Sequence, residues 1–322
     1  MGNGSYSHDA HQALLGARAH LGDAEVFRQS SCHNLMNPKG VRLRECRDGA
    51  EHPNSFGIAF MLDVTGSMGD IPRLIARQEL PKFMKILVDA GFSDAQVMFS
   101  AVGDARADTA PLQVGQFEST AELMDQWLTW SYLEGGGGGN GGESYELAMY
   151  FLAEHTEMDC WVKRKKKGYM FMTGDEPAFP AVSRMQVDAL IGDKLDEDIP
   201  IKEAVAVLQE TFHPFFLIPD LARAQRVERQ WRDLLGDYVI CLEDAQDVCY
   251  VSAGLVALTE GKIKKLSDFE PLLKKAGAPP ARFAPILRAL TPYAGVVGRD
   301  GAPSLSPRPA ASGGFWKKLL GK

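Results

Sequence analysis

The sequence predicts an α/β fold: a Rossmann-like, doubly wound and mostly parallel sheet flanked by helices. Two observations lead to this prediction. Short apolar runs rich in strand-forming residues alternate with helix-length segments from residue 56 to residue 258. Strands separated by helices are joined by crossover connections, which make neighbouring strands parallel. The first run, Phe56 to Leu62, is apolar throughout, as expected of a strand that helices cover on both faces.

The remaining elements follow in order from the same patterns. A helix is expected from Pro72 to Gly91, because proline suits a first helical turn and an apolar stripe continues behind it. The other predicted strands are 95–102, 112–117, 169–173, 215–218 and 238–242. The other predicted helices are 10–21, 120–130, 143–157, 182–191, 201–212, 221–235 and 245–258.

Composition divides the chain into five predicted segments. They are a polar N-terminal extension (1–54), the α/β domain (55–262), a C-terminal helical addition (263–294), a flexible linker rich in Gly, Pro, Ser and Ala (295–314), and a terminal peptide, FWKKLLGK (315–322). If the terminal peptide becomes helical, its large apolar side chains share one face. These are Phe315, Trp316, Leu319 and Leu320. The peptide is therefore a candidate for docking on a protein or on a membrane surface.

Charge and cysteine usage exclude several classes of protein. The 322 residues carry a formal net charge of -7, which argues against a nucleic-acid-binding protein. The five cysteines are an odd number and show no C-x-x-C spacing, which argues against a disulfide framework or a zinc ribbon. We find neither a signal peptide nor an apolar run near the roughly 18 residues of a membrane span. A cytoplasmic protein is expected.

A carboxylate and two hydroxyl groups follow the first strand on one tight turn, in the stretch DVTGSM. Asp63, Thr65 and Ser67 stand at alternate positions, so their side chains can point the same way. Oxygen donors of this kind suit hard divalent cations. Because Mg²⁺ takes about six donors, one loop cannot supply them all, and other loops must contribute.

Two further loops lie where they could contribute. The glycine-rich stretch GGGGGNGGES, Gly135 to Ser144, carries Asn140, and the stretch MTGDEP after the strand 169–173 carries Asp175. Ligands of doubly wound sheets bind at the carboxyl ends of the strands, where the strand order reverses. The sequence therefore predicts a Mg²⁺ (or Mn²⁺) site whose ligands are Asp63, Thr65, Ser67, Asn140 and Asp175.

From about residue 56 to residue 258 the chain resembles a von Willebrand factor A (VWA) domain with a metal-ion-dependent adhesion site, whose first loop reads D-x-[ST]-x-S. It is most similar to the intracellular branch found beside alpha-kinases and in bacterial proteins, where the loops are typically DVTGSM, GGGDGPE and G-D-x-P. The resemblance implies that Asp63, Thr65 and Ser67 are first-loop ligands and that Asp175 is the third-loop carboxylate. Asn140 stands at the second-loop position and lowers the negative charge of the site.

The resemblance also implies a function. In the family, an acidic residue of a partner completes the metal shell, so we expect a metal-dependent adaptor in a bacterial cytoplasmic assembly. A MoxR-type AAA+ ATPase, a kinase, or a component of a stress or defence system is the expected partner. An enzyme is not expected, because the three loops contain no histidine to act as a general base.

Two alternatives stay open. One is a metal-assisted hydrolase with Glu143, Glu176 or Asp70 as its base. The other is a metal-independent scaffold that docks through its C-terminal peptide.

Three other patterns have ordinary explanations. The glycine run lacks the G-x-x-x-x-G-K-[ST] pattern of a phosphate-binding loop. The histidines and cysteines before Asn54 match no common zinc spacing. The basic run from Lys163 to Lys167 is expected to be solvated surface.

Overall fold

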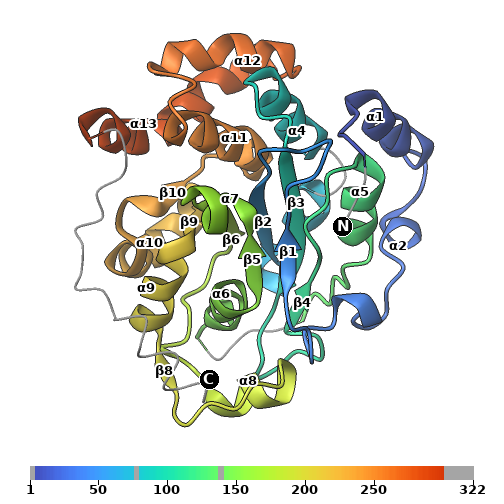
Figure 1. Cartoon of the computed structure of the whole chain (residues 1–322), viewed down its shortest axis with the longest axis vertical. Coiled ribbons are helices and arrows are strands. Elements are labelled where there is room, and N and C mark those ends of the chain that lie inside the picture. The colour runs from blue at the N-terminus through green and yellow to red at the C-terminus, as the bar shows by residue number, and fades with distance from the viewer. Residues whose placement is uncertain (1–3, 76–79, 137–140, 301–322) are drawn as a thin grey trace.

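The computed structural model describes residues 4–75, 80–136 and 141–300. At its centre is a six-stranded sheet with the order β10-β9-β6-β2-β3-β4 (Figure 1). The strands are β2 (Phe56–Asp63), β3 (Ala95–Val102), β4 (Leu112–Val114), β6 (Gly168–Thr173), β9 (Phe212–Ile218) and β10 (Val239–Cys241). All neighbouring strands of this sheet are parallel except β3 and β4. The predicted fold class is confirmed.

The strand order reverses beside β2. From β2 the chain moves outward to β3 and β4, then returns to β6 on the other side of β2 and continues to β9 and β10. The carboxyl ends of β2 and β6 therefore flank the crevice in which ligands of such sheets bind. The loop 64–70 follows β2, and the loop 174–180 follows β6.

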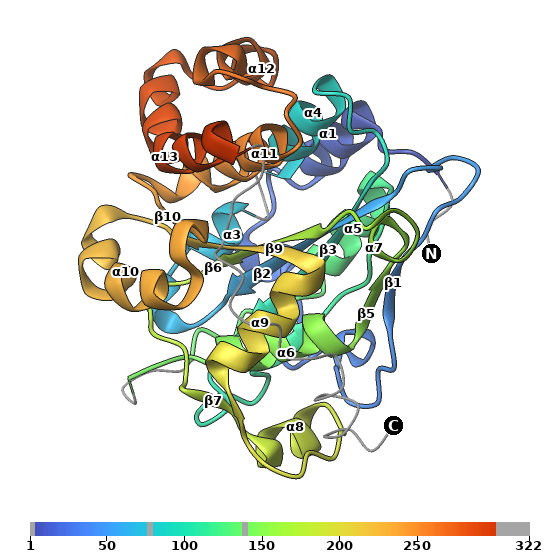
Figure 2. The same ribbon diagram turned by 60° about the vertical axis from the view of Figure 1, so that its left-hand side comes forward.

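Helices cover both faces of the sheet, as Figure 2 shows. On one face α4 (Leu80–Asp89) packs against α11 (Val248–Thr259), and on the other α6 (Tyr145–Glu154) packs against α9 (Ile201–Thr211). This double cover explains why every residue of β2 and of β3 is buried. At the centre of the sheet, the Phe60 ring lies 5.0 Å from the Phe83 ring and 5.4 Å from the Phe171 ring.

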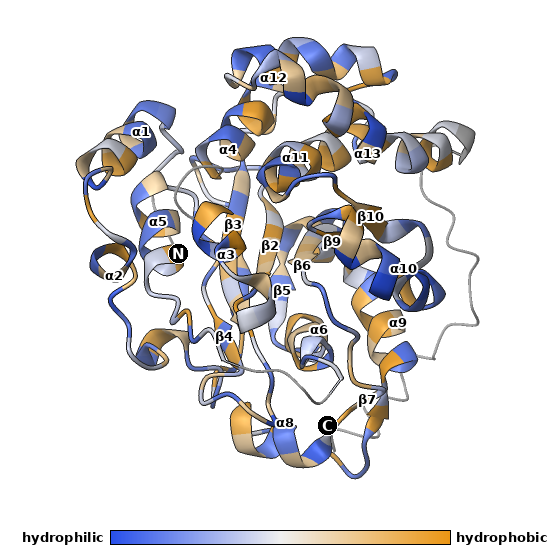
Figure 3. Ribbon diagram, turned by 180° about the vertical axis from the view of Figure 1, so that it is seen from behind, coloured by the Kyte–Doolittle hydropathy of each residue, from blue (hydrophilic) through white to orange (hydrophobic). Residues whose placement is uncertain are grey.

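The last part of the described chain forms a further helical layer over α11. It contains α12 (Glu270–Lys275) and α13 (Pro280–Asp300). Residues 248–258 of α11 are all buried, and α13 packs directly on this helix. By contrast, α10 (Leu221–Leu235), which covers β9 and β10, shows much hydrophilic colour in Figure 3. An apolar helix needs cover on every side, whereas an amphipathic helix can lie at the surface.

The N-terminal segment packs on the α/β core. Helix α1 (His8–Ala17) contacts α4 and α5 (Ala121–Thr129), and just beyond α1 Arg18 donates to the Asp125 carboxylate of α5 at 2.9 Å. The short strand β1 (Arg44–Cys46) pairs in parallel with β5 (Thr156–Met158). The remaining helices and short strands are α2 (Asp23–Val26), α3 (Ile71–Leu74), α7 (Asp159–Arg164), α8 (Arg184–Leu190), β7 (Ala181–Val182) and β8 (Ile199–Pro200).

Several predicted boundaries are wrong; for example, the strand expected over 112–117 ends at Val114, and the helix expected over 10–21 ends at Ala17. Two further differences have a reason in the packing. The helix expected over 143–157 ends at Glu154, because residues 156–158 pair with β1 instead. The linker expected from residue 295 starts too early, because residues 295–300 belong to α13, and Val297 packs against the core. In both places tertiary packing determines the local structure rather than composition.

The basic run Lys163–Lys167 is only in part the solvated surface that its composition suggests, because Lys163 and Lys165 are exposed whereas the other three residues are half-buried. Arg164 donates to both oxygens of the Asp48 carboxylate, at 2.7 and 3.0 Å. Lys166 pairs with Glu260 at 2.9 Å. The run therefore connects the N-terminal segment and α11 to the start of β6.

Within the described ranges, no helix combines the length and the apolar composition that crossing a membrane requires. The candidate docking residues Phe315, Trp316, Leu319 and Leu320 lie outside the described residues, as does the rest of the predicted linker.

Candidate metal centre

The first loop holds its carboxylate and its first hydroxyl group together. Asp63, the last residue of β2, is fully buried, and Thr65 is 3% exposed. The backbone N–H of Thr65 donates to Asp63 Oδ1 at 2.9 Å, and the Thr65 hydroxyl donates to the same oxygen at 2.6 Å. The turn after β2 is therefore closed by the aspartate itself.

Ser67 connects this loop to the loop after β6. Its Oγ lies 3.1 Å from Thr65 Oγ1 and donates to Asp175 Oδ1 at 2.8 Å. Asp175 is 1% exposed, whereas Ser67 is exposed. A continuous row of oxygens thus runs from the buried end of β2 to the surface, and its last two members come from residues 108 positions apart.

The donor set fits a small divalent cation. Neighbouring ligand oxygens around an octahedral Mg²⁺ ion are about 3 Å apart, since each lies about 2.1 Å from the metal at right angles. The successive oxygen separations in the row are 2.6, 3.1 and 2.8 Å. Among the described residues no three His, Cys, Asp or Glu side chains form a metal cluster, so this site depends on the hydroxyl groups of Thr65 and Ser67.

The glycine-rich second loop is held against the first loop by its backbone. Gly66 N donates to the Gly136 carbonyl at 2.7 Å, and Gly135 N donates to the Val64 carbonyl at 3.2 Å. A Cβ atom on Gly66 would lie 2.9 Å from the Gly135 carbonyl oxygen, so the close approach requires glycine there. Asn140 lies outside the described residues, and its role as a ligand stays a prediction.

Two neighbours of the site were missed from the sequence. One is Tyr145, whose hydroxyl donates to Asp63 Oδ2 from the first turn of α6. Its ring is fully buried against Phe216 and Trp231. Gly174 leaves room for it, because a Cβ there would lie 2.3 Å from the Tyr145 hydroxyl oxygen. Tyr145 directly follows the glycine-rich stretch, and its position near the start of a predicted helix was the sequence signal that could have identified it.

The other is Arg223, in the first turn of α10. Its Nε donates to Asp175 Oδ2 at 2.9 Å, and its Nη2 donates to the Ser67 carbonyl at 2.5 Å. Its Nη1 pairs with Asp220, which caps α10 by accepting from Arg223 N at 2.9 Å. Arg226, one turn further on, lies 3.5 Å from Asp175 Oδ2. The order β6 next to β9, which places α10 beside Asp175, was the information that the sequence alone lacked.

Burial controls the electrostatics of the site. It raises the pKa of Asp63 from 3.8 to about 7, although the hydrogen bonds from Thr65 and Tyr145 act in the opposite direction. It also raises the pKa of Glu143 from 4.5 to about 9, with a further contribution from the Asp63 carboxylate. A divalent cation would offset this concentration of buried negative charge.

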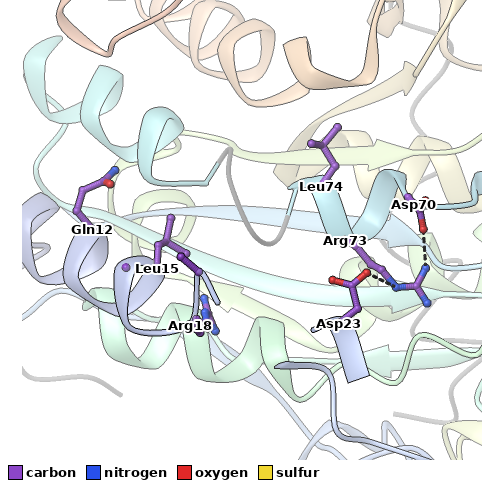
Figure 4. Close-up of a pocket in the computed structure, with 9 residues that line it drawn as sticks. Gln12, Leu15, Arg18, Asp23, Asp70, Arg73 and Leu74 are labelled. Carbon is purple, nitrogen blue, oxygen red and sulfur yellow. Dashed lines mark hydrogen bonds and ion pairs between the residues drawn. The ribbon is translucent and has the colours of Figure 1, made fainter. Parts of the chain in front are cut away.

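The three candidate bases lie in different surroundings. Glu143 is 1% exposed. Glu176 lies 3.9 Å from Arg226. Asp70 has a side chain 93% exposed and pairs with Arg73 at 3.3 Å. Arg73 and Asp70 line a pocket that they share with residues of α1 (Figure 4).

The oxygen row reaches the surface in a shallow depression. The depression is lined by the first loop, the third loop, the start of α10 and the segment after β10. The lining residues are Ser67, Asp175, Asp220, Leu221, Ala222, Arg223, Arg226 and Glu243. Leu221 is 52% exposed and the side chain of Arg226 is 58% exposed. The depression therefore combines a hydroxyl group, an exposed apolar side chain, two arginines and the carboxylates of Asp175, Asp220 and Glu243.

No protein-family model matches the chain, and no curated protein matches it significantly. Among solved structures, it is similar to the pilus adhesin SpaC of Lactobacillus rhamnosus GG in its open conformation, with 12% identity over 67% of this chain and 31% of that one and a TM-score of 0.45. It is also similar to proximal thread matrix protein 1 of the mussel byssus, with 12% identity over 66% of this chain and 48% of that one and a TM-score of 0.39.

A third similar structure is a von Willebrand factor type A protein from Catenulispora acidiphila, with 13% identity and a TM-score of 0.36. The match covers 63% of this chain and 42% of that one. The chain thus spans less than half the length of each of these solved proteins.

Proposed function

We propose that this chain is a VWA-type, divalent-metal-dependent protein-binding module. Mg²⁺ (or Mn²⁺) is held by Asp63, Thr65, Ser67 and Asp175, together with Asn140 from the second loop. The observation that carries the proposal is the row of oxygens at the switch point of the sheet, with separations that suit neighbouring ligands of one small cation. The two carboxylates balance the charge of the ion without exceeding it, and five protein ligands leave one position of an octahedral shell open for a further ligand.

The additional ligand is proposed to be an acidic residue of a partner protein. Ser67 is the exposed member of the oxygen row, so a ligand from outside can reach the ion beside it. Leu221, exposed at the edge of the same depression, offers an apolar contact to the residues around that acid. A carboxylate bound at the centre and an apolar contact beside it are what a small protein interface needs.

Binding is favoured over metal-assisted hydrolysis by the surroundings of the candidate bases. Asp70 points to solvent and pairs with Arg73. Glu176 lies 3.9 Å from the Arg226 cation, and Glu143 is only 1% exposed. These features support a module that captures a partner and does not act as an enzyme.

The biological setting is proposed from the resemblance of the three loops to intracellular VWA domains. On this basis the module is a cytoplasmic adaptor in a bacterial multi-protein system. A MoxR-type AAA+ ATPase, a kinase or a stress or defence component is the proposed kind of partner.

Capture from a native lysate tests the proposal. The wild-type chain and the Asp63→Ala variant are compared, each with Mg²⁺ and with EDTA. Asp70→Ala serves as the matched control, since this aspartate of the same loop is exposed. We expect a partner that is lost with EDTA and with Asp63→Ala but retained with Asp70→Ala, while thermal melts show that all variants are folded.

The alternative scaffold is tested in the same experiment by deleting residues 315–322. A partner that survives EDTA and Asp63→Ala but is lost with this deletion would contradict the proposal and support docking through the terminal peptide.

A further inference from the structure

One carboxylate of the site already has a cation beside it. Asp175 uses Oδ1 to accept from Ser67 and Oδ2 to accept from Arg223. Each nitrogen of the Arg223 guanidinium is engaged, with Asp175, Asp220 and the Ser67 carbonyl. The side chain is only 26% exposed, so solvent screens its charge less than that of a surface arginine.

This arrangement separates two roles of Asp175. Oδ1, the oxygen in the row of candidate ligands, accepts from Ser67. Oδ2, the other oxygen, accepts from Arg223. A divalent ion at the row would therefore meet a carboxylate whose negative charge is largely offset, with a second positive charge close behind it. Like charges at such short range repel even when partly screened.

We propose that Arg223 is an internal counter-cation of the metal site, which offsets the charge of Asp175 and keeps the affinity for a divalent cation low. The inference rests on the proposed function, because it assigns a residue that regulates the same site. A consequence is that the loaded site retains more positive charge than its ligands alone would leave, which favours an acidic partner residue.

Titration of the full chain with Mn²⁺, followed by the electron paramagnetic resonance signal of free Mn²⁺, tests the inference. Arg223→Gln keeps an N–H donor and removes the charge, and we expect it to bind Mn²⁺ about tenfold more tightly than the wild type. Arg223→Lys keeps the charge and should stay within about threefold of the wild type. Arg226→Gln is the matched control and should also change little, because this arginine is further away and more exposed.

Asp220→Asn is a second variant with the opposite expected sign. It keeps a capping side chain on α10 but leaves the charge of Arg223 without its partner, so Mn²⁺ binding should weaken by at least about threefold. If Arg223→Gln does not fold, Asp220→Asn provides the test in its place.

The outcomes separate the two proposals. If the wild type binds Mn²⁺ and Arg223→Gln binds it equally or more weakly, the counter-cation role is refuted and the metal site stands. If neither chain binds Mn²⁺ at millimolar concentration, the proposed function is refuted and this inference falls with it.

Discussion

At the scale of the residue, Gly66 is the position where the first and second loops come closest. An added Cβ would lie 2.9 Å from the Gly135 carbonyl oxygen, and backbone cannot move aside as a flexible side chain can. We expect Gly66→Ala to destabilise the fold by about 1–3 kcal/mol and to weaken Mn²⁺ binding, because it pushes the second loop away. Thermal melts and the Mn²⁺ titration measure the two effects.

Gly49→Ala is the control for this variant. Gly49 is exposed and has open space around its Cβ position, so the change should alter stability by less than about 0.5 kcal/mol. If Gly66→Ala behaves like the control, the two loops are not packed as described.

Glu146, fully buried in the first turn of α6, makes stability depend on pH. Burial raises the pKa of its carboxyl group from 4.5 to about 8, and neither carboxyl oxygen has a hydrogen-bond partner among the described residues. The unfolded chain loses this proton near pH 4.5, while the folded chain keeps it to about pH 8. Since the folded state binds more protons between these values, the free energy of unfolding falls as pH rises through this range.

Glu146→Gln should therefore make the melting temperature fall less steeply between about pH 5 and about pH 8. Glu210→Gln, at an exposed position of α9, should leave the slope as it is in the wild type. Equal slopes in all three proteins would show that Glu146 titrates normally.

The residues of the site were predictable to the extent that local sequence places them. Asp63, Thr65 and Ser67 share one turn, and their hydrogen bonds are local. Asp175 was found because it follows a strand, and the strand order confirms that β6 lies next to β2. Arg223 was missed, because its contact with Asp175 spans 48 positions and depends on β9 lying next to β6.

At the scale of the element, α7 and the basic residues at its end connect three parts of the chain. Arg164 makes two hydrogen bonds with Asp48 and a third with the Ser55 carbonyl at 2.6 Å. Because its side chain is only 28% exposed, Arg164→Met should cost about 2 kcal/mol of stability in chemical denaturation.

Lys163→Met is the control for Arg164→Met. Lys163 also pairs with Asp48, at 3.2 Å, but its side chain is 54% exposed. It should change stability much less. Equal losses in the two variants would argue that the basic run acts through its total charge rather than through the buried hydrogen bonds of Arg164.

The elements themselves were predictable where hydrophobic periodicity is strong. The strand 95–102 and the helix 221–235 have the predicted ends, and β2 extends the predicted strand by one residue. The strands β1 and β5 were missed, since each has three residues and is formed by pairing with the other. Short strands of this kind carry too little local pattern to be recognised.

At the scale of the whole molecule, α13 is part of the hydrophobic core, because it packs directly on α11. Leu290 is fully buried, and it packs so closely on α11 that a Cβ on Gly254 would lie 2.6 Å from Leu290 Cδ1. Leu290→Ala should lower the free energy of unfolding by about 2–5 kcal/mol. In chemical denaturation we expect one cooperative transition that shifts as a whole.

A variant with two separate transitions would contradict this picture, because α12 and α13 would then unfold independently of the sheet. Leu221→Ala is a suitable control, since Leu221 is a leucine of α10 that is 52% exposed. Its effect on stability should be small.

The central claim is that the ends of β2 and β6 bind a divalent cation. Anomalous diffraction from crystals soaked in Mn²⁺ tests it most directly, with crystals of Asp63→Ala as the control. We predict one strong peak at about 2.1–2.5 Å from the hydroxyl oxygens of Thr65 and Ser67, absent in the variant. A map of the wild type without a peak between these loops at millimolar Mn²⁺ would contradict the account.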